Sequence, residues 1–375
     1  MALKGVFSME NSNIKIIRKA LLSAIRAVGL RDNNFPLVTM SGDGNRIVIT
    51  AVSRDEQARA HVSVRTAFPE IAISGKLADK FLSVMGDAEI SLRITEKEVL
   101  LEDSTSCFHL PMAQKTAVMP FSEPDDFLGE IKLTEEIVQA LSMLPGLIDK
   151  GETAPMFMGV HFVAADGLCH VMAINRHSLV EQLVPAEGKF DINVEPAIFS
   201  HMEEGGKLRF FKKTVEIISE DNNEFYAPVL VNEEGKTSSL FATATGKISP
   251  KEVEVKRLDL IAAAEKCGVV ASIGEGGHEV ACVLSGTQDG KALKLSVKTE
   301  VGATEALIPL LKPADVAGYR EGIAPRALLA LKKRKSVMLK IRLGEVGPAT
   351  AFAVREQTAG KEKDFLYVFT SIRLH

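Results

Sequence analysis

Residues 15–30 read KIIRKALLSAIRAVGL. Apolar residues recur in this stretch at the spacing of one helix face: Ile16, Ile17, Leu21, Leu22, Ile25 and Val28. Residues 134–148 (TEEIVQALSMLPGLI) and residues 256–271 (KRLDLIAAAEKCGVVA) have the same character. The three predicted helices begin 119 and 122 residues apart. A period this regular indicates repeated structural units.

Each repeat carries the same further signals. A second helix is predicted near its middle, at residues 76–85, 196–203 and 325–334. An Asp-Gly turn precedes a strand each time, at Asp43-Gly44, Asp166-Gly167 and Asp289-Gly290. Two strands joined by a short turn follow each second helix, at 89–94 and 99–103, 207–212 and 215–219, and 336–343 and 349–355. We therefore predict three domains of one α+β fold, covering residues 1–126, 127–250 and 251–375.

The composition is that of a globular protein. The chain has 375 residues, of which 46% are hydrophobic and 25% charged, with a net charge of −4. A near-neutral total excludes a polybasic protein but leaves room for one basic face. No apolar run reaches the roughly 18 residues of a membrane span. Cys107, Cys169, Cys267 and Cys282 form no CxxC pair and are interpreted as buried free thiols of a cytoplasmic protein without a metal site.

The sequence contains none of the common catalytic motifs. GxSxG, HExxH and a GxGxxG that opens a helix are all missing. Gly235-Lys236-Thr237 matches the end of a phosphate-binding loop, but Leu230 stands where that loop requires glycine, so a hairpin turn is the preferred interpretation. We expect a non-catalytic protein without a cofactor. A nucleotide-dependent enzyme that uses Gly235-Lys236-Thr237 is the alternative.

Basic residues concentrate on the predicted helices, whereas acidic residues gather in loops. The helical cations are Lys15, Arg18, Lys19, Arg26, Lys76, Lys80, Lys256, Arg257, Lys332 and Lys333. Such a distribution suits contact with phosphates without reading of bases. A solvated outer helix face would give the same pattern. The second repeat differs, because Glu135 and Glu136 open its first helix.

The threefold repeat and the last residues, YVFTSIRLH (367–375), resemble the bacterial and phage replicative sliding clamp, the beta subunit of DNA polymerase III. Residues 76–85, 108–111 with 120–127, and 159–180 also match. The resemblance implies three tandem copies of the DNA-clamp fold, with helices that line a ring and antiparallel sheets outside. It implies a head-to-tail homodimer that encircles double-stranded DNA and tethers the replicative polymerase for processive synthesis. A clamp-fold interaction scaffold without DNA sliding is a further alternative.

The same resemblance assigns site residues. A cleft that receives short peptides of the polymerase and of the clamp loader would be formed by Phe157, Ile174, His177, Leu179, Ile248, Val368, Ile372, Arg373 and Leu374. The dimer interface would be formed by Phe108 and Leu110 on one side and by Val269 and Val270 on the other, and Arg31 would contact DNA. Taken alone, the C-terminal stretch reads as a last edge strand with a frayed end. Asn175-Arg176 stands where the family has Asp-Gly, and Ser178 stands where it has arginine. These departures bear on peptide preference rather than on the fold.

Overall fold

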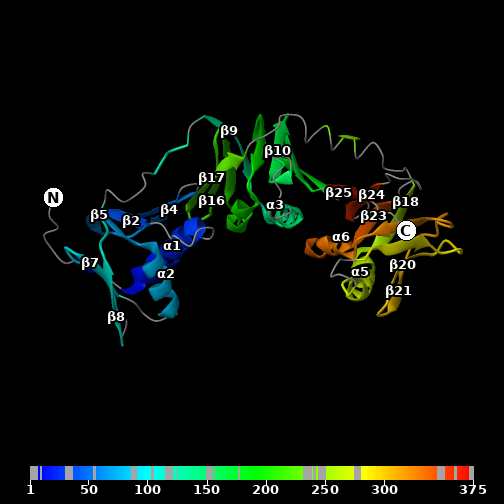
Figure 1. The fold of residues 1–375 in the computed structure, drawn as a ribbon. Helices are drawn as coiled ribbons and strands as arrows, with labels where there is room; N and C mark the ends of the chain where they lie inside the picture. The colour runs from blue at the N-terminus through cyan, green and yellow to red at the C-terminus, as the bar shows by residue number, and fades with distance from the viewer. Residues whose placement is uncertain are drawn as a thin grey trace. The chain divides into compact units, whose positions relative to one another are not determined.

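The computed structural model describes most of the chain. The described residues are 7–8, 11–29, 37–53, 56–85, 91–102, 105–114, 121–124, 126–148, 154, 157–175, 178–230, 239, 242–243, 251–273, 280–343, 351–358 and 361–370. They form two compact units, Met1–Glu135 with Ser200–Val229, and Glu136–Phe199 with Leu230–His375. Each unit combines antiparallel sheets with helices on their faces (Figure 1).

The elements follow one another in three blocks, as the repeat predicts. The first block holds β1 (Phe7–Ser8), α1 (Asn11–Gly29), β2 (Leu37–Asp43), β3 (Ile47–Val52), β4 (Gln57–Val62), β5 (Ala67–Ser74), α2 (Gly75–Val84), β6 (Ser91–Ile94), β7 (Glu98–Glu102) and β8 (Cys107–Pro111). The second holds β9 (Phe127–Lys132), α3 (Glu135–Leu141), η2 (Leu144–Leu147), β10 (Val160–Ala165), β11 (Leu168–Ile174), β12 (Ser178–Pro185), β13 (Glu187–Gly188), β14 (Phe190–Val194), η4 (Pro196–His201), β15 (Lys207–Phe211), β16 (Thr214–Ile218) and β17 (Glu224–Leu230). The third holds β18 (Glu252–Lys256), α5 (Arg257–Ala271), β19 (Cys282–Gly286), β20 (Ala292–Lys298), β21 (Ala303–Pro309), β22 (Arg320–Ile323), α6 (Pro325–Leu329), η6 (Ala330–Lys333), β23 (Met338–Arg342), β24 (Ala351–Thr358) and β25 (Lys361–Thr370).

Local sequence explains most of these boundaries. Gly44, Gly167 and Gly290 have φ values of +99°, +83° and +67°, so the predicted Asp-Gly turns use the backbone freedom of glycine. The side chain of Ser74 caps α2 by accepting a hydrogen bond from the amide of Leu77.

The predicted helix at 134–148 is wrong in length. Pro145 lacks an amide hydrogen, and the chain there is a 3₁₀ turn, η2, after α3 has ended at Leu141.

The other second-block helix is also shorter than predicted. Residues 196–201 form the 3₁₀ turn η4 instead of an α-helix, whereas α1, α2 and α5 confirm their predicted positions. α1 buries its apolar face, including Ile17, Leu21 and Ile25, against β3 and β4. None of the described helices has the length and apolar character needed to cross a membrane. Cys169, Cys267 and Cys282 are buried, but Cys107 is exposed because it lies on the outer face of β8, so the predicted burial is wrong there.

The two large sheets share one organisation. In the first unit the described strands run β9-β15-β16-β17-β4-β3-β2-β5, and in the second they run β14-β10-β11-β12-β25-β24-β23-β18. The first sheet pairs β4 of the first block with β17 of the second, and the second sheet pairs β12 of the second block with β25 of the third. Because both sheets cross predicted domain borders, the compact units differ from the predicted domains. The borders near residues 126 and 250 stay predictions.

Two smaller sheets complete the described fold. They run β1-β6-β7-β8 in the first unit and β21-β20-β19-β22 in the second. Within every block the second strand pairs with the fifth and the first with the sixth, if the two-residue β13 is set aside. This repeated pairing makes the blocks three copies of one α+β topology.

Candidate functional site

Four of the predicted cleft residues come together in the second unit. Ile174, Leu179 and Val368 belong to one buried apolar cluster with Ala353 and Leu366, and Phe157 packs against it, partly exposed. The register of the sheet creates this cluster. Ile174 of β11 faces Leu179 of β12, which faces Val368 of β25. The remaining cleft predictions, His177, Ile248, Ile372, Arg373 and Leu374, lie outside the described residues.

The turn that leads into this cluster is held by Asn175. Its side-chain amide donates to the carbonyl of Leu147 at 2.8 Å, and its Oδ1 accepts from the amide of Ser178 at 2.6 Å and from the Ser178 hydroxyl at 3.0 Å. Asn175 and Ser178 are two of the positions at which the sequence departs from the clamp pattern. Asn175 and Ser178 hydrogen-bond to each other, so the two departures belong to one turn. This turn fixes the ends of β11 and β12 beside the cluster.

Arg334 ties the third block to the second inside this unit. Its guanidinium lies over the ring of Phe365 at 4.2 Å and donates to the carbonyl of Ala140 and to Oε1 of Gln182, both at 3.4 Å. The side chain is buried. Within the basic run at residues 332–335, Arg334 therefore serves packing, whereas Lys332 is exposed and forms an ion pair with Glu265.

We expect Arg334→Ala to lower the free energy of unfolding by about 1–3 kcal/mol, because it removes a buried cation–π contact and leaves polar groups without their donor. Arg334→Met should cost less, because it keeps most of the packing volume. Urea denaturation of both variants measures the difference. Lys332→Ala is the matched control, and an equal loss in that exposed neighbour would contradict the assignment.

The predicted DNA-facing cations divide into three groups. Lys76, Lys80 and Lys256 are exposed and make no ion pair with any described residue. Lys19, Arg26 and Lys332 are exposed but held by carboxylates. Arg18 and Arg257 donate to the carbonyls of Leu82 and Ser336, so they support packing between helices and neighbouring segments. The side chains of Lys15 and Lys333, and all of Arg31, lie outside the description.

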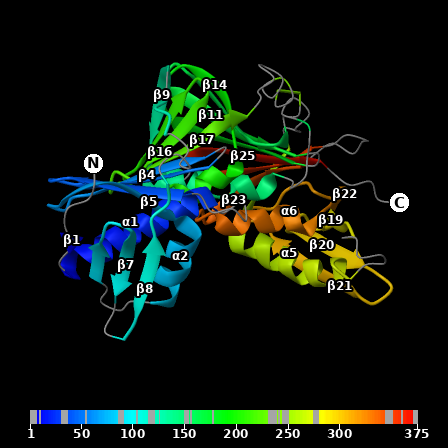
Figure 2. The ribbon, with the colours of Figure 1, turned by 60° about the vertical axis from the view of Figure 1, so that its left-hand side comes forward.

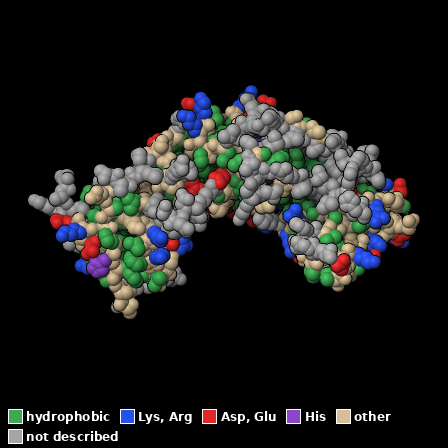
Figure 3. All heavy atoms as spheres, viewed as in Figure 1, with side chains coloured by type: hydrophobic (Ala, Val, Ile, Leu, Met, Phe, Trp, Pro, Cys, Tyr) green, Lys and Arg blue, Asp and Glu red, His purple; other side chains and the backbone are tan. Residues whose placement is uncertain are grey.

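The predicted interface residues also differ from one another. Phe108 of β8 stacks on Phe81 of α2, with ring centroids 4.5 Å apart, and is half-buried. Leu110 is 1% exposed and belongs to the core of its own chain. Val269 of α5 is 63% exposed, and Val270 is half-buried. Exposed apolar side chains gather over α2 with β8 and over α5 with β21 (Figure 3).

Sequence reasoning missed several members of these two surfaces. Leu77 and Val84 are exposed on α2, Ile273 is exposed just after α5, and Leu307 is exposed on β21. Each is exposed, and Leu307 stands on the strand at the end of its sheet. A strand pattern with an apolar residue on its solvent face could have indicated Leu307, but its exposure depends on which strand lies at the edge.

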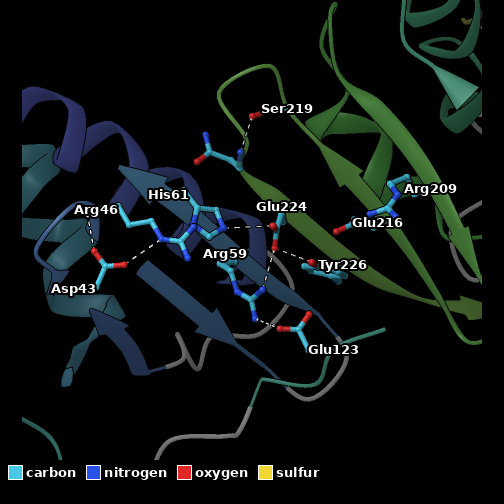
Figure 4. Close-up of polar contacts among 11 residues, drawn as sticks. Asp43, Arg46, Arg59, His61, Glu123, Arg209, Glu216, Ser219, Glu224 and Tyr226 are labelled. Carbon is cyan, nitrogen blue, oxygen red and sulfur yellow. Dashed lines mark hydrogen bonds and ion pairs between the residues drawn. The ribbon is translucent and has the colours of Figure 1, made fainter. Parts of the chain in front are cut away.

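The two joints between blocks inside the units are built differently. At the β4–β17 joint, Arg59 forms ion pairs with Glu123 at 2.6 Å and with Glu224 at 3.3 Å, and it covers the ring of Phe121 at 3.7 Å. Nε2 of His61 lies 3.3 Å from Glu224, and the hydroxyl of Tyr226 donates to Glu224 at 2.7 Å (Figure 4). This joint is built on ion pairs, whereas the β12–β25 joint combines the apolar cluster with the contacts of buried Arg334 to Gln182 and Phe365.

Buried Glu216 lies on the neighbouring strand and pairs with Arg209 at 2.8 Å. Burial raises the pKa of Glu216, although the nearby hydroxyl of Tyr226 and the charge of Arg209 act to lower it. Burial also acts on Glu224, but hydrogen bonds from His61 and Tyr226 and the charge of Arg59 outweigh it, so the pKa of Glu224 is lowered. Ionisation of Glu216 therefore lowers the free energy of unfolding, whereas ionisation of Glu224 raises it.

We expect Glu216→Gln and Glu224→Gln to change the pH dependence of stability in opposite directions. The contribution of Glu216 is present at low pH and falls as pH rises above its ordinary pKa of 4.5. The contribution of Glu224 is present above pH 4.5 and is lost on acidification. The gain in unfolding free energy from about pH 3 to about pH 7.5, a range that spans both shifted pKa values, should therefore be larger than wild type in Glu216→Gln and smaller in Glu224→Gln. Urea denaturation at both pH values measures it, and a shift of the same sign in both variants would refute the scheme.

Among the described residues, two strands at the ends of sheets lack the pairing with another block that the corresponding strands have. The fourth strand of the first block (β4) pairs with the eighth of the second (β17), and the fourth of the second (β12) pairs with the eighth of the third (β25). The fourth strand of the third block, β21, and the eighth of the first, β8, each end a four-stranded sheet among the described residues. Three such copies, joined fourth strand to eighth strand, define a DNA-clamp fold.

Solved structures share this fold over nearly the whole chain. The DNA polymerase sliding clamp from Bacillus subtilis matches with a TM-score of 0.82 at 12% identity, covering 99% of both chains. The beta subunit from DNA polymerase of Streptococcus pyogenes matches with a TM-score of 0.81 at 16% identity, covering 99% of this chain and all of that one. The beta clamp of Helicobacter pylori, solved in complex with diflunisal, matches with a TM-score of 0.80 at 12% identity and the same coverage.

Comparison by sequence gives no such match: neither a protein family model nor a curated protein is similar enough to be recognised. The structural likeness confirms the predicted fold class, the sliding-clamp fold of the DNA polymerase III beta subunit. Because sequence identity to these structures is only 12–16%, the likeness shows a shared fold and nothing more specific.

Proposed function

We propose that this chain is a DNA sliding clamp, a non-catalytic cytoplasmic processivity factor with domains 1–126, 127–250 and 251–375. Two copies associate head to tail, pairing β8 of each with β21 of the other, and close a ring around double-stranded DNA. The observation that carries the proposal is the pairing of fourth strand with eighth strand, which is used twice inside the chain. Repeating it between copies uses both open edges, and a head-to-tail contact that closes makes a ring.

The two surfaces beside these edges are chemically suited to each other. The α2 and β8 surface presents Leu77, Val84 and the Phe81–Phe108 stack, and the α5 and β21 surface presents Val269, Ile273 and Leu307. Exposed apolar patches of this kind are typical of protein interaction sites.

The ring would hold duplex DNA through cations on its helices, without reading sequence. The replicative polymerase and the clamp loader would bind through short linear peptides at the apolar cluster formed by Ile174, Leu179, Val368, Ala353 and Leu366 with Phe157. Their buried apolar core with a partly exposed aromatic side chain at its margin supports a peptide site.

Two measurements on the purified protein test the proposal. Gel filtration with light scattering should give twice the chain mass of 40.6 kDa. The loaded protein should stay on closed circular DNA and leave it after the circle is cut. A stable monomer that is not retained would reject the proposal. A dimer whose DNA association is absent or insensitive to salt would instead favour the interaction scaffold.

A further inference from the structure

Three cations of the helix surface are held by carboxylates from other segments. Nζ of Lys19 on α1 lies 2.9 Å from Oδ2 of Asp221, which follows β16. Nε of Arg26 on α1 lies 2.9 Å from Oδ1 of Asp79 on α2, and its Nη2 donates to the hydroxyl of Ser83 at 3.0 Å.

The third pair joins the helical segments of the third block. Nζ of Lys332 in η6 lies 2.6 Å from Oε1 of Glu265 on α5. Half or more of each of the three cationic side chains is exposed, so these ion pairs contribute little to stability and a competing anion can reach them.

The pairs lie on the helices that the proposed ring turns toward DNA. Lys19 and Arg26 are seven residues apart, which places them on one side of α1, two turns from each other. α1 contacts α2, where Lys76 and Lys80 are exposed beside Asp79. α5 and α6 lie side by side, and η6 continues from α6 (Figure 2). The carboxylates therefore stand on the surface where phosphates would approach.

The pair at Lys19 has additional acidic support. The hydrogen bond and charge of Asp221 raise the pKa of Lys19, and the charge of Glu203 adds to the effect. One carboxylate thus contacts the exposed ammonium group and a second acts on it through its charge, much as successive phosphates along a DNA strand would.

We propose that Asp79, Asp221 and Glu265 act as internal substitutes for DNA phosphates, each holding a helix cation until duplex DNA displaces the carboxylate. The inference rests on the proposed function, since it takes the helix surface as the one that meets DNA. Displacement frees a carboxylate, which takes up a cation from solution and offsets the counterion that the phosphate releases. The three pairs therefore weaken the hold on DNA and flatten its salt dependence, as suits a ring that must slide.

The test is binding of a 30-base-pair fluorescent duplex between 50 and 200 mM salt. Asp79→Asn, Asp221→Asn and Glu265→Gln remove each charge with little change of shape. Each substitution should make the slope of log K against log salt steeper by about 0.9 and tighten binding about two- to fivefold. Asp126→Asn is the matched control. It removes the same charge and frees Lys212, which follows β15 and belongs to no helix, so the slope should not change.

A triple variant with the slope of wild type, or a control with the slope of the triple variant, would overturn the inference. Should Asp79→Asn loosen the contact between α1 and α2 in thermal unfolding, Asp221→Asn with Glu265→Gln carries the test alone, with a slope steeper by about 1.8. Failure of the proposed function looks different, because the wild-type protein would then not be retained on closed circular DNA. Retention with an unchanged slope rejects only the role of the three carboxylates.

Discussion

Val269→Glu with Leu307→Glu is expected to convert the proposed dimer into a folded monomer that no longer stays on closed circular DNA. Both side chains are 63% exposed in the single chain, so the monomer should keep its stability. In the ring they would be buried against the surface of α2 and β8. Burial of each aliphatic side chain is worth about 1.5–3 kcal/mol, and an unpaired carboxylate in its place adds several kcal/mol. We expect the dimer to weaken at least about a hundredfold, measured by light scattering across a concentration series.

Leu258→Glu is the matched control for this substitution. Leu258 is 67% exposed and lies on the same helix as Val269, eleven residues or about 16 Å away along its axis. It carries the same change of charge and of apolar area, at the opposite end of α5 from Val269. The double variant should be monomeric and the control dimeric. Equal dissociation of both, or of neither, would show that the interface is elsewhere.

The parts of the fold that depend on short stretches of chain could be predicted from the sequence. Helical spacing identifies α1, and the Asp-Gly pairs identify three turns, because a left-handed glycine and an amphipathic helix are specified within a few residues. Pro145 was also visible in the sequence, yet the predicted helix ran through it. The apolar spacing continued there while the amide hydrogen that a helix needs was missing.

Pairing between distant strands could not be predicted in this way. Read alone, the C-terminal stretch is an edge strand, but β25 lies inside its sheet between β12 and β24. The residues near Val368 in the sequence do not indicate that Leu179 lies opposite it in the sheet. The same limit applies to charge. Arg334 and Lys332 belong to one basic run, but only the packing of Phe365 and α3 against that segment determines that Arg334 is buried.

The candidate sites followed from resemblance more than from residue chemistry. Apolar residues such as Ile174 and Phe157 have no signature that separates a peptide site from a core, and the structure places them in one cluster without testing its function. Leu110 illustrates the converse, because the alignment that assigns it to an interface cannot tell that its side chain points into its own sheet's core. Exposure is a property of the assembled sheet, so it becomes known only with the strand order.

Removal of residues 372–375 is expected to abolish binding of partner peptides while leaving the ring intact. These residues lie outside the described part of the chain, but β25 ends at Thr370, two residues after Val368 of the apolar cluster. The resemblance assigns Ile372, Arg373 and Leu374 to the same cleft. We expect Phe157→Ala to weaken peptide binding at least about thirtyfold, because loss of an aromatic contact that dominates an interface costs about 2 kcal/mol or more. Fluorescence anisotropy with a peptide carrying two adjacent apolar residues, taken from the polymerase of the same organism, measures both.

Phe127→Ala is the matched control for the aromatic substitution. Phe127 is 52% exposed on β9 and packs on Phe211, in the other unit of the chain. It should leave peptide affinity unchanged, because it removes the same ring from a surface unrelated to the cluster. Light scattering on all three variants should still give a dimer, since neither the cluster nor β9 borders β8 or β21. Full peptide affinity in the truncated chain would reject the mapped cleft, whereas loss of the dimer would show that the C-terminal residues serve assembly instead.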